Sequence, residues 1–123
     1  MRVYLALGAS LIALACEDPA DLTAGELAVR VTPPVVELTN HTPAPVYFFA
    51  IEGGLAIRAN WAPCTDPSRC RAVAPAGSLD LAFSQIAGYH TDAETAIVYW
   101  WHLIPGGETG FRPDSIRAVG IRF

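Results

Sequence analysis

Hydrophobic and polar residues alternate with a period of two along most of the chain after residue 25. Successive side chains of a β-strand point to opposite faces of a sheet, so this period predicts strands that each bury one face. Gly, Pro and Asn residues, which favour turns, separate the alternating stretches. Seven strands are therefore expected, at about residues 27–32, 36–39, 46–51, 55–61, 79–84, 96–104 and 116–123.

Two of the expected strands are hydrophobic on both faces. They have the sequences VYFFAI (46–51) and AIVYWWHLI (96–104). A strand covered on both sides shows this composition, so the two strands are expected to pair at the centre of one sheet. Seven short strands in about 100 residues resemble an immunoglobulin-like or fibronectin-III-like domain. The expected fold is all-β, a single antiparallel seven-strand immunoglobulin-like β-sandwich over 26–123 that follows an N-terminal helical signal segment.

The two central strands are rich in aromatic residues, and their alternation must send some of these to each side of the sheet. The even-numbered positions include the polar residues Glu52 and His102, which favours this side as the solvent-facing one. We therefore expect Phe48, Val98 and Trp100 to face outward as a candidate binding patch. His102 would lie at the edge of this patch. The odd-numbered positions are expected to fill the core: Tyr47, Phe49, Ile51, Ile97, Tyr99, Trp101 and Leu103. The alternative is that a loop covers the outward-facing residues.

The first 16 residues differ in composition from the rest. Arg2 is followed by the uncharged segment 3–15, which is mostly Leu, Ala and Ile. This segment is too short for a membrane-spanning helix, which needs about 20 residues, but it suits the core of a secretory signal. The sequence ALAC (13–16) resembles the lipobox of bacterial lipoprotein signals, although the commoner lipobox has Leu where this chain has Ala13. The resemblance covers 1–16 and implies that the chain is cut before Cys16, whose thiol then carries a lipid.

The lipobox resemblance divides the chain into three parts: a signal peptide over 1–15, a lipid-anchored tether over 16–25 and the β-domain over 26–123. It implies a place in the bacterial cell envelope, with the membrane as a partner through the N-terminal lipid. By the sorting rule of this family, Glu17 after the cysteine favours the outer membrane over the inner membrane of a Gram-negative cell. Two alternatives remain, an ordinary cleaved secretory signal and a structural helix with an incidental cysteine.

Cys64 and Cys70 are the other two cysteines, and the five residues between them include the turn-forming Asp66, Pro67 and Ser68. In an oxidising envelope, two such neighbours are expected to form a local disulfide. A redox or metal pair is less favoured, because C-x5-C is not the C-x-x-C spacing of redox and zinc sites. A disulfide between these two would leave Cys16 without a partner for a disulfide of its own.

Charge and motifs argue against several classes of function. The net charge is −4, and the eight basic residues, all Arg, are scattered, which argues against a nucleic-acid partner. His41 and His90 are expected in loops. Ser84, His90 and Asp92 could be combined into a triad, but no G-x-S-x-G motif accompanies them. We therefore expect no enzymatic activity, no cofactor and no metal site.

The expected function is non-catalytic binding by an envelope lipoprotein, with an unknown protein or glycan as the partner. Phe48, Val98, Trp100 and His102 would form the site on the sheet face. An alternative is a protease-inhibitor-like or envelope-assembly module that binds through its loops, here 62–72 and 105–113. A metal-binding or hydrolytic protein is less favoured. Sandwich domains serve many functions, so the fold alone does not choose among these.

Overall fold

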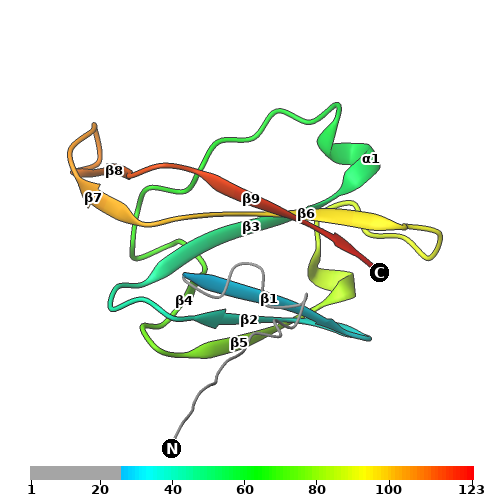
Figure 1. Cartoon of the computed structure of the whole chain (residues 1–123). Helices are drawn as coiled ribbons and strands as arrows, with labels where there is room; N and C mark the ends of the chain where they lie inside the picture. Colours follow the sequence, from blue (N-terminus) through cyan, green and yellow to red (C-terminus); the bar gives the residue numbers. More distant parts are fainter. Residues whose placement is uncertain (1–25) are drawn as a thin grey trace, which may run out of the picture.

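The computed structural model describes residues 26–123, which form an all-β domain (Figure 1). Two antiparallel sheets pack against each other, and a short hairpin extends beyond one end of them. The predicted all-β, antiparallel architecture is confirmed. The predicted signal peptide, the tether and Cys16 lie outside the described residues.

Nine strands make up these sheets, with few helical residues between them. The three-stranded sheet has the order β1 (Leu27–Thr32), β2 (Val35–Asn40) and β5 (Ser78–Ala82). The four-stranded sheet has the order β4 (Ala72–Val73), β3 (Val46–Glu52), β6 (Thr95–Trp101) and β9 (Arg117–Arg122). The hairpin consists of β7 (Leu103–Pro105) and β8 (Phe111–Pro113). A four-residue helix, α1 (Gly53–Ala56), and a 3-10 turn, η3 (Phe83–Gln85), complete the domain.

The hydrophobic core lies between the two sheets. Alternate residues of β2 supply Val36 and Leu38, and alternate residues of β6 supply Val98 and Trp100. Each of these side chains is almost entirely buried. Alternate residues of a strand face the opposite sheet, so these positions are the ones that the second sheet covers. Burial of this apolar surface stabilises the sandwich by about 25 cal/mol for each Å² removed from water.

The pairing of the two most hydrophobic strands is confirmed. β3 and β6 lie side by side and antiparallel, with Phe48 opposite Trp100 and Ala50 opposite Val98. They are the two inner strands of the four-stranded sheet, which explains why both of their faces are hydrophobic.

The predicted strand over 55–61 is wrong. The chain leaves β3 at Glu52, whose carboxylate accepts hydrogen bonds from the backbone N–H groups of Gly54 (2.8 Å) and Leu55 (2.9 Å). These bonds cap the first turn of α1, so the chain begins a helix where the alternation predicted a strand. Ile57, which would have faced the core, is 86% exposed.

The structure also divides the longest predicted strand, 96–104. β6 ends at Trp101 and β7 begins at Leu103, so His102 lies at the break between them. The alternation did not predict β4 or β8, which have only two and three residues. A period of two cannot be recognised over so short a stretch.

Candidate functional site

The expected orientation of the aromatic residues on β3 and β6 is wrong. Phe48, Val98 and Trp100 are only 7%, 0% and 3% exposed and lie in the core between the sheets, so they form no exposed patch. Glu52 and His102 misled the prediction because both lie at strand ends, where a polar residue marks the point at which the chain leaves the sheet. The odd-numbered residues face outward instead.

The outer side of the four-stranded sheet carries a cluster of aromatic side chains, which we call the aromatic face: Phe49, Trp61, Tyr99 and Trp101. The ring of Trp61 is central, with its centroid 5.1 Å from Phe49, 4.6 Å from Tyr99 and 6.0 Å from Trp101. Tilted pairs at these separations attract one another beyond simple burial of area. Trp101 is buried beneath the cluster, whereas the other three rings remain partly exposed.

The segment 57–71, which we call the disulfide loop, supplies Trp61 and lies against the aromatic face. Cys64 and Cys70 form a disulfide, as predicted. The indole Nε1 of Trp101 donates a hydrogen bond to the backbone oxygen of Cys64 (3.1 Å), which attaches the loop to the sheet. Within the loop, the Asp66 carboxylate accepts bonds from the Ser68 hydroxyl (2.7 Å) and backbone N–H (3.0 Å). These bonds lower the pKa of Asp66 and hold the turn between the cysteines.

One hollow adjoins the aromatic face, and a second lies farther along the four-stranded sheet. The first, of about 250 Å³, lies beside the disulfide and is lined by rings of the aromatic face together with Arg69 and Arg71. The second, of about 720 Å³, is shallow and lies beside α1, where it is lined by Ile57, Ile97 and Gly120 among others. No atom lies within 4 Å of the position that a Cβ on Gly120 would take, so the sheet is open above this strand.

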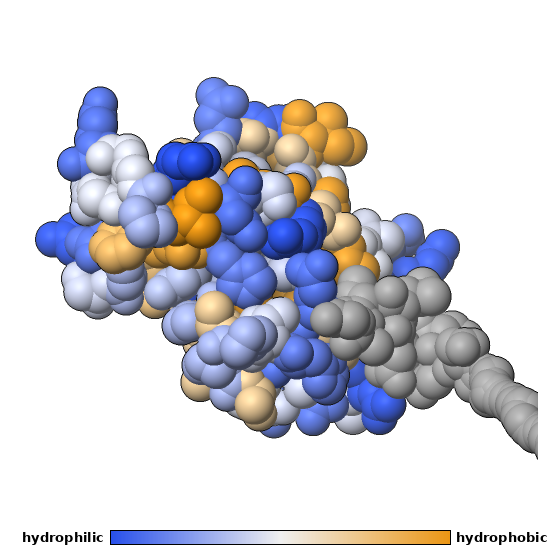
Figure 2. Space-filling model, turned by 60° about the vertical axis from the view of Figure 1, so that its left-hand side comes forward, coloured by the Kyte–Doolittle hydropathy of each residue, from blue (hydrophilic) through white to orange (hydrophobic). Residues whose placement is uncertain are grey.

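Exposed hydrophobic surface is unevenly distributed over the side of the molecule seen in Figure 2. Figure 2 shows exposed hydrophobic atoms mostly in the upper part of the molecule, which holds the four-stranded sheet, the disulfide loop and the hairpin. The lower part, which holds the three-stranded sheet, is mostly hydrophilic in this view. Exposed hydrophobic surface of this kind commonly marks a contact with another molecule.

His102 belongs to a hydrogen-bonded network at the opposite end of β6 from α1. Its Nε2 lies 3.1 Å from the Thr42 hydroxyl, and its Nδ1 lies 3.5 Å from an Asp114 carboxylate oxygen. The Thr42 hydroxyl has one proton, and it also lies 2.7 Å from the side-chain oxygen of Asn40. The backbone oxygen of Ala44 is a further acceptor near this hydroxyl (2.9 Å), and the direction of the bond between Thr42 and His102 depends on the imidazole tautomer. Because these bonds join the turn after β2 to the end of β6, we interpret the network as a structural tie.

Asp114 links this network to the strand end. Burial raises its pKa, but hydrogen bonds from the backbone N–H groups of Ser115 and His102, and the charges of Arg117 and His102, outweigh that effect. The pKa of Asp114 therefore lies below its usual value of 3.8. Arg117 also lies over the ring of Trp100, with 4.6 Å between its guanidinium carbon and the ring centroid.

Ser84, His90 and Asp92 are not brought together as a triad. No hydrogen bond or ion pair joins them within the described part of the chain. His90 instead lies 4.0 Å from the Glu52 carboxylate, at the distance limit of an ion pair. The pKa of Glu52 is lowered mainly by the N–H groups of Gly54 and Leu55, so its negative charge serves to cap α1.

The sequence patterns did not single out Trp61 or Arg71. Trp61 was assigned to a strand because it follows Ala59 and Ile57 at a spacing of two. The signal that could have placed it in a loop is local, since Pro63 and Cys64 come two and three residues after it. Arg71 directly follows Cys70, and nothing in its sequence neighbourhood marks it as part of a hollow.

Residues 26–123 contain no group of three or more His, Cys, Asp or Glu side chains that could hold a metal ion. No helix within the same range is both long and apolar enough to cross a membrane. In comparisons with known proteins, no family model, no curated sequence and no solved structure matches this chain. The described residues thus define a small antiparallel β-domain with an internal disulfide and an aromatic outer face.

Proposed function

We propose that this protein is a bacterial envelope lipoprotein whose β-domain is a non-catalytic binding module, held at the membrane by a lipid on Cys16. The aromatic face and the adjoining disulfide loop form its binding surface, and the partner is a protein or a glycan. One observation carries the proposal: three partly exposed aromatic rings lie together on one side of a sheet, and two of them, Phe49 and Trp61, line the hollow beside the disulfide.

Large aromatic side chains suit this role for a physical reason. They offer much contact area at a small cost in conformational entropy, and they are enriched at the centres of binding surfaces. Trp61 is already held by Phe49 and Tyr99, so little of its freedom remains to be lost when a partner covers it. The disulfide restrains the loop on which Trp61 sits in the same way.

The strand order supports an immunoglobulin-like assignment of the fold. In immunoglobulin domains, strands B and E lie in one sheet, and strands C, F and G adjoin in the other. Here β2 and β5 are neighbours in the three-stranded sheet, and β3, β6 and β9 follow one another in the four-stranded sheet. Such domains commonly serve as adhesion and assembly modules, which is compatible with binding but does not identify the partner.

The lipid anchor is tested by replacing Cys16 with Ser and labelling cells with an alkyne-bearing fatty acid. The unmodified chain should be labelled and should sediment with membranes, whereas the variant should do neither. The double variant Cys64→Ser/Cys70→Ser is the control and should still be labelled. A Cys16→Ser chain that remains labelled and membrane-bound would refute the anchor.

The binding surface is tested by hydroxyl-radical footprinting of the full chain in its native envelope and after purification. Oxidation of Trp61 and Tyr99 should fall several-fold in the envelope, because the partner covers both rings. Phe111, which is 38% exposed on the hairpin, should be oxidised equally in both samples. Equal oxidation of Trp61 in the two samples would contradict the proposal.

A second candidate surface is formed by the loops. The Thr109 hydroxyl donates to the Thr65 hydroxyl (3.2 Å), which brings the β7–β8 hairpin against the disulfide loop. The loops 62–72 and 105–113 therefore meet, and this contact favours an inhibitor-like or assembly role that uses both of them. Footprinting separates the two candidates, because loop binding would protect Phe111 and leave Tyr99 unchanged.

A further inference from the structure

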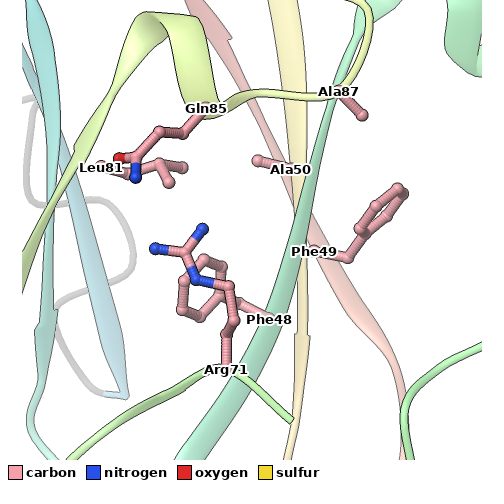
Figure 3. A pocket seen from close by; sticks show the side chains of 7 residues that line it. All are labelled: Phe48, Phe49, Ala50, Arg71, Leu81, Gln85 and Ala87. Atoms are coloured by element: carbon pink, nitrogen blue, oxygen red, sulfur yellow. The ribbon is translucent and has the colours of Figure 1, made fainter. Parts of the chain in front are cut away.

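A third hollow lies between the two sheets, on the side where β3 and β5 face each other. We call it the inter-sheet hollow; its volume is about 190 Å³. Phe48 and Ala50 of β3 line one wall and Leu81 of β5 lines the other, while Arg71 and Gln85 stand at the mouth (Figure 3). The ring of Phe49 points to the far side of β3, where the aromatic face lies (Figure 3), and the inter-sheet hollow shares Phe48, Phe49 and Arg71 with the hollow beside the disulfide.

The sandwich is open here because the neighbouring edge strand is short. β4 pairs only with Val46 and Tyr47, at the beginning of β3. Farther along the same edge of β3, Ala87 is bridged opposite Ile51, and its backbone N–H donates to the Ala50 oxygen (3.1 Å). β5 is the last strand of its own sheet, so nothing extends that sheet across the gap. Between these two contacts, at Phe48 and Phe49, no strand of the described range pairs with this edge of β3, and the hollow opens there although Phe48 and Ala50 are only 7% and 6% exposed.

Two hydrogen-bond donors converge on the mouth of this hollow. Arg71 lies over the ring of Phe48, with its guanidinium carbon 5.1 Å from the ring centroid. This contact restrains the side chain and leaves its N–H groups available. The side-chain oxygen of Gln85 accepts from the backbone N–H of Ala82 (2.9 Å), which fixes the amide so that its NH₂ group is the free end. In Figure 3 this nitrogen and the Arg71 guanidinium point into the same space.

No carboxylate balances these donors. None of the residues that line the inter-sheet hollow is Asp or Glu. Within the described residues, Arg71 makes no ion pair and no hydrogen bond, whereas the nearby Arg69 is paired with Asp66 at 3.7 Å. A restrained guanidinium beside a second donor suits a planar anion with two acceptor oxygens, and a carboxylate has that geometry.

We propose that the inter-sheet hollow binds the C-terminus of a partner polypeptide, with its carboxylate on Arg71 and Gln85 and its last, apolar side chain against Phe48, Ala50 and Leu81. The volume supports one side chain, since a cavity of about 150 Å³ holds a molecule of the size of benzene. It is below the range of roughly 300–1,000 Å³ for larger ligands, which argues against a long acyl chain. C-terminal carboxylates are a known class of peptide-recognition element.

The test is an affinity measurement on the purified full-length chain with synthetic peptides. The probe is an N-acetylated Gly-Ser peptide that ends in Leu, prepared as the free acid and as the C-terminal amide. The free acid should bind about tenfold more tightly than the amide, because only the acid offers two charged acceptors. A free-acid peptide that ends in Ser should also bind more weakly, because it leaves the apolar walls uncovered.

Variants assign the effect to Arg71. Arg71→Gln should weaken binding of the free acid to the level of the amide, and Arg71→Lys should restore part of it, since it keeps the charge and loses the planar fork. Arg69→Gln, with the same change in charge, is the matched control and should bind as the unmodified chain does. Trp61→Ala should also leave peptide affinity unchanged. Peptide binding in the inter-sheet hollow and partner binding at the aromatic face can therefore fail independently of each other.

Three results would overturn the proposal. These are equal affinity for the acid and the amide, unchanged affinity in the Arg71→Gln variant, and no binding of the free acid at millimolar concentration. Tighter binding of decanoate, with displacement of the peptide, would assign the hollow to fatty acids and would also contradict it. Backbone NMR spectra of each variant show whether the fold is retained.

Discussion

At the scale of single residues, the most consequential buried polar group is Asn40. Its side chain is fully buried, and its amide NH₂ donates to the backbone oxygens of Ala44 (2.8 Å) and Val73 (3.0 Å). Its oxygen accepts from the Thr42 backbone N–H (2.9 Å) and hydroxyl. One side chain therefore joins the end of β2 to the turn after it and to the end of β4 in the other sheet. The sequence predicted only a turn here, because a single buried polar residue does not produce a periodic pattern of hydrophobic positions.

Asn40→Ala should lower the free energy of unfolding by about 2–4 kcal/mol, since it leaves several buried backbone groups without a partner. Urea denaturation measures this difference. Asn60→Ala is the matched control at an exposed site and should change stability by less than about 0.5 kcal/mol. Similar unfolding midpoints for the two variants would show that the Asn40 bonds do not hold the sheets together.

Asp114 makes stability depend on pH. Its pKa in the folded protein lies below the usual 3.8, so its stabilising contribution is present above that value and is lost as the pH falls through the lowered pKa. Asp114→Asn should therefore be less stable by about 1–2 kcal/mol at pH 7, and the gap should close as the pH approaches 2. Asp80→Asn on the exposed side of β5 serves as the control. Denaturant unfolding at several pH values tests this, and a constant gap for Asp114→Asn would contradict it.

At the scale of elements, the disulfide loop determines the shape of the aromatic face. The covalent bond closes the loop, the Trp101 indole holds it to β6, and Trp61 packs onto the sheet beside it. The loop explains why Trp101 can be buried on the outer side of a sheet. Sequence spacing predicted the disulfide correctly, because two cysteines so close in the chain have few other partners. It could not predict where the loop would lie, since that depends on contacts between distant residues.

Reduction of the disulfide should lower the free energy of unfolding by about 2 kcal/mol, the value expected for closing so small a loop. For a domain of this size, the unfolding midpoint should fall by on the order of 10 °C. Thermal unfolding followed by circular dichroism, with and without reductant, measures this change. The double variant Cys64→Ser/Cys70→Ser should not respond to reductant. An unchanged midpoint in the reduced native chain would show that the bond does not support the loop.

The strands show which sequence signals are dependable. Alternation located β1, β2, β3, β5 and β9, because inward-facing residues of these strands are more buried than most of their outward-facing neighbours, or, in β3, both faces are buried. It failed over 55–61, where Glu52 starts a helix by accepting two backbone hydrogen bonds. It also assigned the faces of β3 and β6 the wrong way round. Both sides of these strands are hydrophobic, so only the polar residues at their ends distinguished the two sides. A polar residue at the end of a strand does not show which face of that strand is buried.

At the scale of the whole molecule, the aromatic face lies on the outer side of the four-stranded sheet, whereas the part that holds the three-stranded sheet is mostly hydrophilic in the view of Figure 2. The anchor on Cys16 would hold the domain at a membrane, and the aromatic face would then meet a partner within the envelope. The inter-sheet hollow adds a second contact on a neighbouring side, and Arg71 lies between that hollow and the one beside the disulfide. The central claim is that the aromatic face is the surface by which the domain binds.

Site-specific photo-crosslinking in cells of the native organism tests this claim most directly. A benzoylphenylalanine placed at Ala62, which lines the hollow beside the disulfide, should yield an adduct of defined mass. The same residue at Asp80, on the outer side of β5, should yield none. Adding Trp61→Ala should remove the adduct from position 62. No adduct from position 62, or the same adducts from both positions, would contradict the assignment of the aromatic face as the binding surface.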